Sequence, residues 1–134
     1  MEFNLKHNSA DSARGACQII TVTQARKLSA SGLKVDKACK GFLSSILKRG
    51  DMEGKAGQTL LLPSVPGLAV QRVLLVGCGK ESDMNERSFT RIIGSVASAL
   101  DFLLKRTQPV CKVLVLLKQF KFEAMLAVLF KYIF

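Results

Sequence analysis

Short runs of large aliphatic and β-branched residues alternate along this chain with longer segments whose apolar residues recur every three or four positions. The short runs are typical of strands, and the longer segments are typical of amphipathic helices. The pattern predicts strands at Phe3 to Leu5, Ala16 to Val22, Gln58 to Leu62, Val73 to Val76 and Val110 to Leu117.

Two segments predict helices. One apolar stripe runs from Leu33 to Leu47, and Gly50 follows it as a stop signal. A second stripe runs from Phe89 to Leu104 and ends at Lys105. Asn85 precedes this second stripe, and its side-chain oxygen can accept from backbone N–H groups of the first turn. We therefore expect Asn85 to be the N-cap of a long helix.

The order of these elements indicates the fold class. Strands that are separated by helices of this length favour an α/β fold. The four consecutive aliphatic residues from Val73 to Val76 are typical of a strand that is covered on both faces. The sequence thus predicts a three-layer α/β sandwich with a mixed, largely parallel sheet.

Length and composition agree with one small domain. The chain has 134 residues, of which 49% are hydrophobic and 22% are charged, and this composition excludes a disordered polymer. The first fifteen residues contain several charges and no long apolar run, so we expect a cytoplasmic location. The longest apolar run, Ala124 to Phe130, is far short of the roughly twenty residues that cross a bilayer, so no membrane association is expected.

The charge balance is strongly basic. A formal net charge of +10 attracts polyanions such as nucleic acid, but it says nothing about fold or chemistry. Scattered lysines and arginines can contact phosphates without reading bases, which would give non-specific DNA binding. A well-solvated basic surface explains the same composition.

Residues that could bind metal or catalyse a reaction are sparse. Cys17, Cys39, Cys78 and Cys111 form no C-x-x-C pair and are expected to be buried free thiols. His7 is the only histidine, so neither a zinc site nor a nucleophile with a histidine base is expected. The acidic residues are spread singly near turns. We therefore predict no catalytic and no metal-binding residues.

One turn resembles a phosphate-binding loop. Gly77, Gly79 and Lys80 follow the predicted buried strand, and glycines permit a phosphate to approach the backbone. A Walker loop would need a glycine where Leu74 stands and a hydroxyl where Glu81 stands. A strand-ending turn, which also favours glycine, is the alternative interpretation.

Residues 49 to 80, reading RGDMEGKAGQTLLLPSVPGLAVQRVLLVGCGK, resemble the amino-terminal domain of bacterial leucyl (cytosol) aminopeptidases. The resemblance continues upstream through the opening MEFNLK and through ACQIITV at 16 to 22, and downstream through NERSFTRII at 85 to 93. It covers about the first 110 residues.

This resemblance implies a non-catalytic domain with a fold similar to that of macro domains. In the family, this domain helps to arrange a hexamer, while a second, carboxy-terminal domain uses two divalent metal ions, zinc or manganese, to activate the attacking water. The family's metal-binding signature, Asn-Thr-Asp-Ala-Glu-Gly-Arg, has no match here. The resemblance therefore implies an inactive fragment without a cofactor of its own, whose partners are copies of itself or other aminopeptidase subunits.

The tail departs from the family pattern. We expect an aminopeptidase-like domain at 1–117 and a divergent apolar tail at 118–134 that comes from a truncation or a frameshift. Two other functions stay open. One is a basic DNA-binding or architectural module. The other is a macro-like nucleotide-binding module with Gly77 to Lys80 as its phosphate loop, although the adenine-side acidic residue of such modules has no counterpart.

Overall fold

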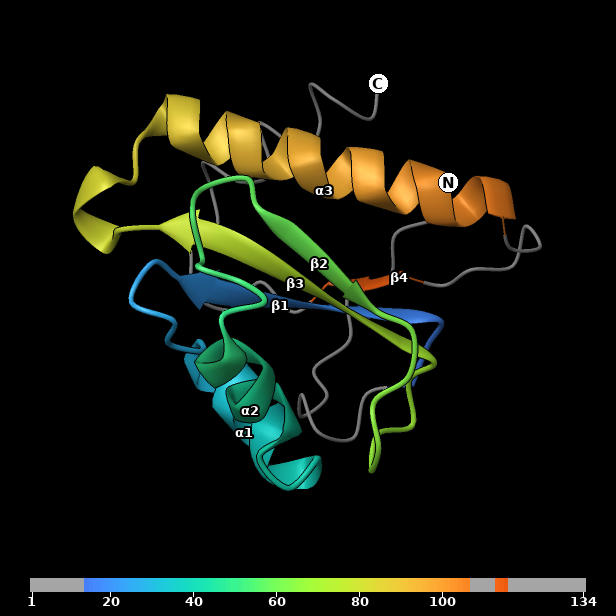
Figure 1. Ribbon diagram of the computed structural model, residues 1–134. Coiled ribbons are helices and arrows are strands. Elements are labelled where there is room, and N and C mark those ends of the chain that lie inside the picture. The colour runs from blue at the N-terminus through green and yellow to red at the C-terminus, as the bar shows by residue number, and fades with distance from the viewer. Residues whose placement is uncertain (1–13, 107–112, 116–134) are drawn as a thin grey trace.

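The computed structural model describes residues 14–106 and 113–115 of the chain (Figure 1). In chain order, its elements are β1 (Cys17–Thr23), α1 (Ala30–Ala38), α2 (Phe42–Arg49), β2 (Thr59–Leu62), β3 (Arg72–Gly79), the 3₁₀ turn η2 (Glu81–Asp83), α3 (Glu86–Arg106) and β4 (Val113–Val115).

The strands form a four-stranded sheet in the order β2-β3-β1-β4. Strand β1 pairs in parallel with β3 and with β4, whereas β2 pairs antiparallel with β3. In this register Ile19 of β1 lies opposite Leu74 of β3, and Leu75 of β3 lies opposite Leu60 of β2. The predicted mixed, largely parallel sheet is confirmed.

Helices cover the sheet on both faces: α3 lies on one side, and α1 and α2 lie on the other (Figure 1). Successive residues of a strand point to opposite faces, so β1 and β3 supply two separate cores. Ile20, Val73 and Leu75 belong to the core that also contains Val35 of α1 and Leu43 of α2. The residues that share the second core with Ile92 of α3 are Cys17, Ile19, Leu74, Val76 and Cys78. The prediction that residues 73–76 are covered on both faces is confirmed.

The first predicted helix is two helices. The chain turns sharply between α1 and α2, where Lys40 (φ +55°) and Gly41 (φ +79°) adopt left-handed backbone conformations that stop a right-handed helix. Leu33, which we expected in the core-facing stripe, is 51% exposed, and the residues that α1 buries are instead Gly32, Val35 and Asp36. Gly50 ends α2 with a φ of +89°, as predicted.

The second predicted helix is confirmed with its cap. The Ser88 N–H donates to Oδ1 of Asn85 (2.9 Å), and the Asn85 N–H donates to Oγ of Ser88 (2.9 Å). This reciprocal pair satisfies donors that the first turn of a helix leaves without a partner. It fixes the point at which α3 begins over the sheet.

Several predictions fall outside the described residues. These are the strand at Phe3 to Leu5, the positions of His7 and Cys111, the domain boundary after Leu117 and the tail at 118–134. The last predicted strand is described only at Val113–Val115. Among the residues that the structure describes, no helix has the length and apolar character that a membrane span requires.

Candidate functional site

Gly77, Gly79 and Lys80 lie at the carboxyl end of β3, beside the carboxyl end of the parallel strand β1. In open α/β sheets, ligands bind at this end of the strands. The structure therefore places the candidate phosphate loop where a ligand site would be expected. The neighbours of these glycines decide what the turn can bind.

The loop from Glu53 to Gln58 occupies this end of β3. The Gly77 N–H donates to the Gln58 carbonyl oxygen (2.7 Å), and the Gly79 N–H donates to the Gly54 carbonyl oxygen (2.9 Å). In return, the Gly57 N–H donates to the Gly77 carbonyl oxygen (3.0 Å). A phosphate-binding turn needs backbone N–H groups that are free to point at the ligand. Both glycine N–H groups here are used within the chain.

Glycine is required at these positions because two backbone segments come into close contact. A Cβ atom on Gly77 would lie 2.1 Å from the carbonyl oxygen of Lys55, and a Cβ atom on Gly54 would lie 2.1 Å from that of Thr23. Gly54 and Gly79 also have φ values of +80° and +73°, which favour glycine. These contacts explain the glycines as packing positions of the 53–58 loop.

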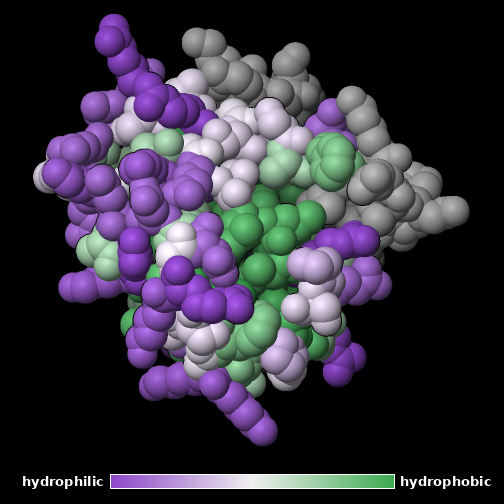
Figure 2. All heavy atoms as spheres, viewed as in Figure 1, coloured by the Kyte–Doolittle hydropathy of each residue, from purple (hydrophilic) through white to green (hydrophobic). Residues whose placement is uncertain are grey.

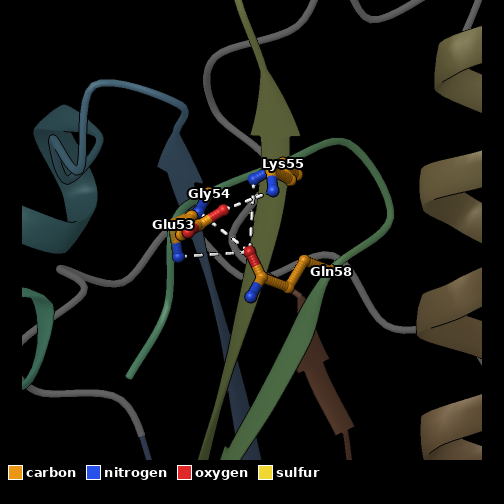
Figure 3. A network of polar contacts seen from close by, with 4 residues as sticks. All are labelled: Glu53, Gly54, Lys55 and Gln58. Atoms are coloured by element: carbon orange, nitrogen blue, oxygen red, sulfur yellow. Dashed lines mark hydrogen bonds and ion pairs between the residues drawn. The ribbon is translucent and has the colours of Figure 1, made fainter. Parts of the chain in front are cut away.

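The loop has its own polar network, which is shown in Figure 3. Oε1 of Gln58 accepts from three successive backbone N–H groups, those of Glu53 (3.2 Å), Gly54 (3.1 Å) and Lys55 (3.3 Å). Converging N–H groups of this kind form an anion-binding nest, which is filled here by a neutral amide oxygen. A side-chain hydrogen bond from Lys55 lowers the pKa of Glu53, and the two form an ion pair. The side chain of Gln58 thus holds the loop closed from within the chain.

Lys80, the cation of the candidate loop, is exposed just beyond the end of β3. Its carbonyl oxygen accepts from the Asp83 N–H (3.1 Å) in the 3₁₀ turn that follows. The described residues contain no group of three or more His, Cys, Asp or Glu side chains placed to hold a metal ion. The two metal ions that the family implies therefore have no ligand set in this part of the chain.

The thiols lie inside the protein. Cys17, Cys39 and Cys78 are free and buried, as predicted for these three residues. Burial raises the pKa of Cys78 to about 11 and also raises that of Cys39. Since the thiolate is the reactive form, both side chains are poor nucleophiles at neutral pH.

Sequence reasoning missed an open hollow of about 620 Å³ between β2 and α3. Most of the residues that line it are small, and Arg91 is the only charged residue of the lining. The lining residues are Gly57, Thr59, Arg91, Gly94, Ser95, Ser98 and Ala99. The helical spacing of Gly94, Ser95 and Ser98 was the available signal, because small residues three or four positions apart leave a depression on one side of a helix. Figure 2 shows apolar residues near the centre of the face that it presents. On the α3 side of β2, Leu61 packs against the core that contains Ile92, whereas Leu60 and Leu62 pack on the opposite side of the sheet.

Residues 19–125 match the model of the cytosol aminopeptidase family, N-terminal domain. The chain belongs to the cytosol aminopeptidase family. This membership confirms the resemblance that residues 49 to 80 indicated.

Curated relatives agree with this assignment. The chain is 50% identical over 101 residues to a probable cytosol aminopeptidase of Tolumonas auensis, a match that covers 75% of this chain. It is 48% identical over 100 residues to that of Actinobacillus pleuropneumoniae and 48% identical over 101 residues to that of Vibrio campbellii, each again over 75% of this chain. The match spans only 20% of the length of each of these relatives.

Solved structures share the fold. The macrodomain of Mycobacterium tuberculosis DarG superposes with a TM-score of 0.69 at 10% identity, covering 94% of this chain and 86% of that one. A mutant of tomato leucine aminopeptidase superposes with a TM-score of 0.59 at 23% identity, covering 82% of this chain and 21% of that one. The predicted similarity to macro domains is confirmed at the level of the fold. DNA binding stays a prediction.

Proposed function

We propose that this chain is a non-catalytic amino-terminal domain of a leucyl aminopeptidase and that it serves assembly with other aminopeptidase subunits. In this proposal, metal-dependent release of amino-terminal residues belongs to a part of the enzyme beyond this domain. Family membership and the matched fifth of the relatives' length support this role.

The observation that carries the proposal is the closed end of β3. The backbone bonds from Gly77 and Gly79 to the 53–58 loop use the donors that a phosphate or a reacting group would need. This loop contributes buried packing to the sheet edge: Gly54 lies against Thr23, and Gly77 lies against Lys55. The geometry favours a packing role over a ligand site.

An activity assay tests the catalytic part of the proposal. The purified chain is incubated with leucine p-nitroanilide and either manganese or zinc, and the full-length Tolumonas auensis relative serves as the positive control. We expect no release of p-nitroaniline by the chain, because its described residues supply no metal ligand set. Turnover that survives repurification and disappears with a chelator would contradict the proposal.

A titration with ADP-ribose tests the nucleotide-binding alternative. We expect no saturable heat signal in calorimetry, because the Gly77 and Gly79 N–H groups already have backbone acceptors. Saturable binding that is lost in a Lys80→Ala variant would instead identify the turn as a phosphate loop.

Assembly is measured separately. The fluorescently labelled chain is co-expressed with the full-length relative, and the products are separated by size-exclusion chromatography with light scattering. We expect the label to co-elute with the oligomer of the relative. A label that always elutes at the mass of the free chain would remove the assembly role and leave the absence of catalysis unaffected.

A further inference from the structure

The layer formed by α1, α2 and the turn that precedes them carries positive charge almost exclusively. Every lysine and arginine between residues 26 and 49 is exposed, namely Arg26, Lys27, Lys34, Lys37, Lys40, Lys48 and Arg49. Asp36 is the only acidic residue in the same range. This layer is therefore a strongly basic part of the described surface.

Asp36 does not neutralise this surface, because it is used inside the protein. It is only 8% exposed, and its carboxylate accepts from the Ser44 N–H (3.1 Å) and from the Ser44 hydroxyl. Among the described residues, the only ion pair of the layer joins Arg49 to Asp51 at the end of α2 (3.3 Å). The lysines of α1 have no acidic partner within the described part of the chain.

One exposed apolar side chain lies among these basic residues. Leu33 is 51% exposed and occupies the outer side of α1, whose buried residues are Gly32, Val35 and Asp36. Lys37 is one helical turn further along the same side, and Lys34 is adjacent. Most side chains as large as leucine on this layer are buried, so Leu33 is an apolar contact point bordered by lysines.

The turn after α1 presents one more lysine at a conformational cost. Lys40 has a φ of +55°, and this left-handed conformation is disfavoured relative to a right-handed one for residues with a Cβ atom. Glycine or asparagine would fit this position better. Strained backbone positions of this kind cluster at functional sites.

We propose that the outer side of α1 and the Lys40 turn form a docking surface for an acidic peptide segment of a protein partner. Carboxylates of the segment contact Lys34, Lys37 and Lys40, and an apolar side chain of the segment packs on Leu33. The peptide class fits better than nucleic acid, because a leucine offers neither charge to phosphates nor an aromatic face to bases.

Peptide binding tests this proposal. The probe is a fluorescent peptide of about ten residues that contains mainly glutamate with two central leucines, and its binding to the full chain is followed by anisotropy near physiological salt. A second peptide has serine in place of both leucines, and a DNA duplex of similar charge is the third probe. We expect the leucine-containing peptide to bind more tightly than the other two.

Two matched variants locate the surface. The double variant Lys34→Glu with Lys37→Glu should weaken peptide binding by roughly tenfold or more, because two attractions become repulsions. The control, Arg87→Glu with Arg91→Glu, makes the same change in net charge on α3, across the sheet from α1 (Figure 1). We expect less than about a twofold effect from the control. Equal losses in both variants would show general attraction to a basic protein and would overturn the proposal.

Variants at Leu33 and Lys40 distinguish peptide docking from general attraction between opposite charges and from an effect on folding. Leu33→Ser should weaken binding of the leucine-containing peptide and leave the serine peptide and DNA unchanged. Lys40→Asn should raise the thermal midpoint, because asparagine tolerates the left-handed conformation, while it weakens peptide binding. Tighter binding of DNA than of the leucine peptide, with no effect of Leu33→Ser, would replace the acidic segment by nucleic acid and refute the proposal.

Discussion

At the scale of single residues, Gln58 shows how one side chain fixes a loop. Its Oε1 atom is shared by the N–H groups of Glu53, Gly54 and Lys55, which would otherwise point into one small space. The Gly54 N–H is part-buried, and such a group costs free energy when it has no acceptor, whereas the Glu53 and Lys55 N–H groups are in exposed positions that water can reach. Gln58 therefore determines whether the loop can lie over the glycines of β3.

Changing the acceptor at Gln58 should change stability in opposite directions. Gln58→Leu leaves three N–H groups without this acceptor and should lower the free energy of unfolding by about 1–3 kcal/mol. Gln58→Glu places a carboxylate in the nest and should raise it by about 1 kcal/mol at pH 7, since hydrogen bonds to charged groups are stronger.

The pH dependence checks the cause. The N–H groups favour the charged form of the introduced carboxylate and lower its pKa, so the gain is present above the ordinary glutamate pKa and is lost as the pH falls through the lowered value. Urea unfolding of the three proteins between pH 3 and 7, at about one-unit steps, measures this. A Gln58→Glu variant that is as unstable as Gln58→Leu at pH 7 would show that Oε1 is not the acceptor that matters.

Cys78 should make the protein sensitive to alkali. Burial raises the pKa of this thiol from 9.0 to about 11, so between these values the folded state holds a proton that the unfolded state has lost. Stability from this group is fully present below pH 9 and falls as the pH rises toward 11, by up to about 3 kcal/mol. Denaturant unfolding in the presence of a reductant measures the fall.

The control for Cys78 is Cys78→Ala. It loses packing in the core beneath α3 at every pH but has no thiol to ionise, so its stability should fall less steeply over the same range. Parallel curves for the two proteins would mean that other groups, such as the lysines, cause the alkaline loss.

At the scale of elements, sequence periodicity predicted most strands and the long helix but missed the break between α1 and α2. The periodic signal of residues 33–47 continues across Cys39 to Gly41, because both helices face the same core. The break depends on Asp36, which reaches Ser44 eight residues later, and such a contact leaves no periodic trace. Likewise, the glycines of the β3 turn were visible in the sequence, whereas the 53–58 loop that covers them was not.

Asp36 should hold α1 and α2 together. Ser44 is the third residue of α2, and Gly41 at the N-cap has no side chain to accept from the first turn, so Asp36 acts as the cap from the preceding helix. Asp36→Ala should lower the free energy of unfolding by about 1–3 kcal/mol, because the carboxylate accepts from the Ser44 N–H, the Ser44 hydroxyl and the Cys39 thiol, and its removal leaves the part-buried Ser44 N–H without its acceptor. Thermal and urea unfolding give the value.

Asp36→Asn is the matched variant. It keeps one carbonyl oxygen for the Ser44 N–H, so we expect a smaller loss than with alanine. A Ser44→Ala variant removes only the hydroxyl contact. If Asp36→Ala leaves stability unchanged, the α1–α2 turn is held by Lys40 and Gly41 alone.

At the scale of the whole molecule, the two cores on either side of the sheet were predictable and the surfaces were not. Consecutive aliphatic residues in β3 require cover on both faces, and this requirement fixes a three-layer fold for β1, β3 and the helices that pack on them. The distribution of positive charge over the surface depends on which carboxylates accept hydrogen bonds inside the protein, as Asp36 does from Ser44. Composition alone therefore gave the sign of the charge but not the α1 surface on which it gathers.

The tail at 118–134 supplies the remaining test at this scale. Its segment 120–134 contains five aromatic residues, Phe120, Phe122, Phe130, Tyr132 and Phe134. The same segment contains only three charged residues, Lys121, Glu123 and Lys131. An apolar stretch of this kind on a soluble protein is either an interface or an aggregation liability.

We predict that removal of everything after Gln119 raises the soluble yield and leaves the thermal midpoint unchanged or higher. A second truncation after Met125, where the match to the family model ends, is the control and should give an intermediate yield. A midpoint that falls by more than roughly 5 °C, the shift that about 1 kcal/mol causes in a domain of this size, would instead make the tail an integral packing element.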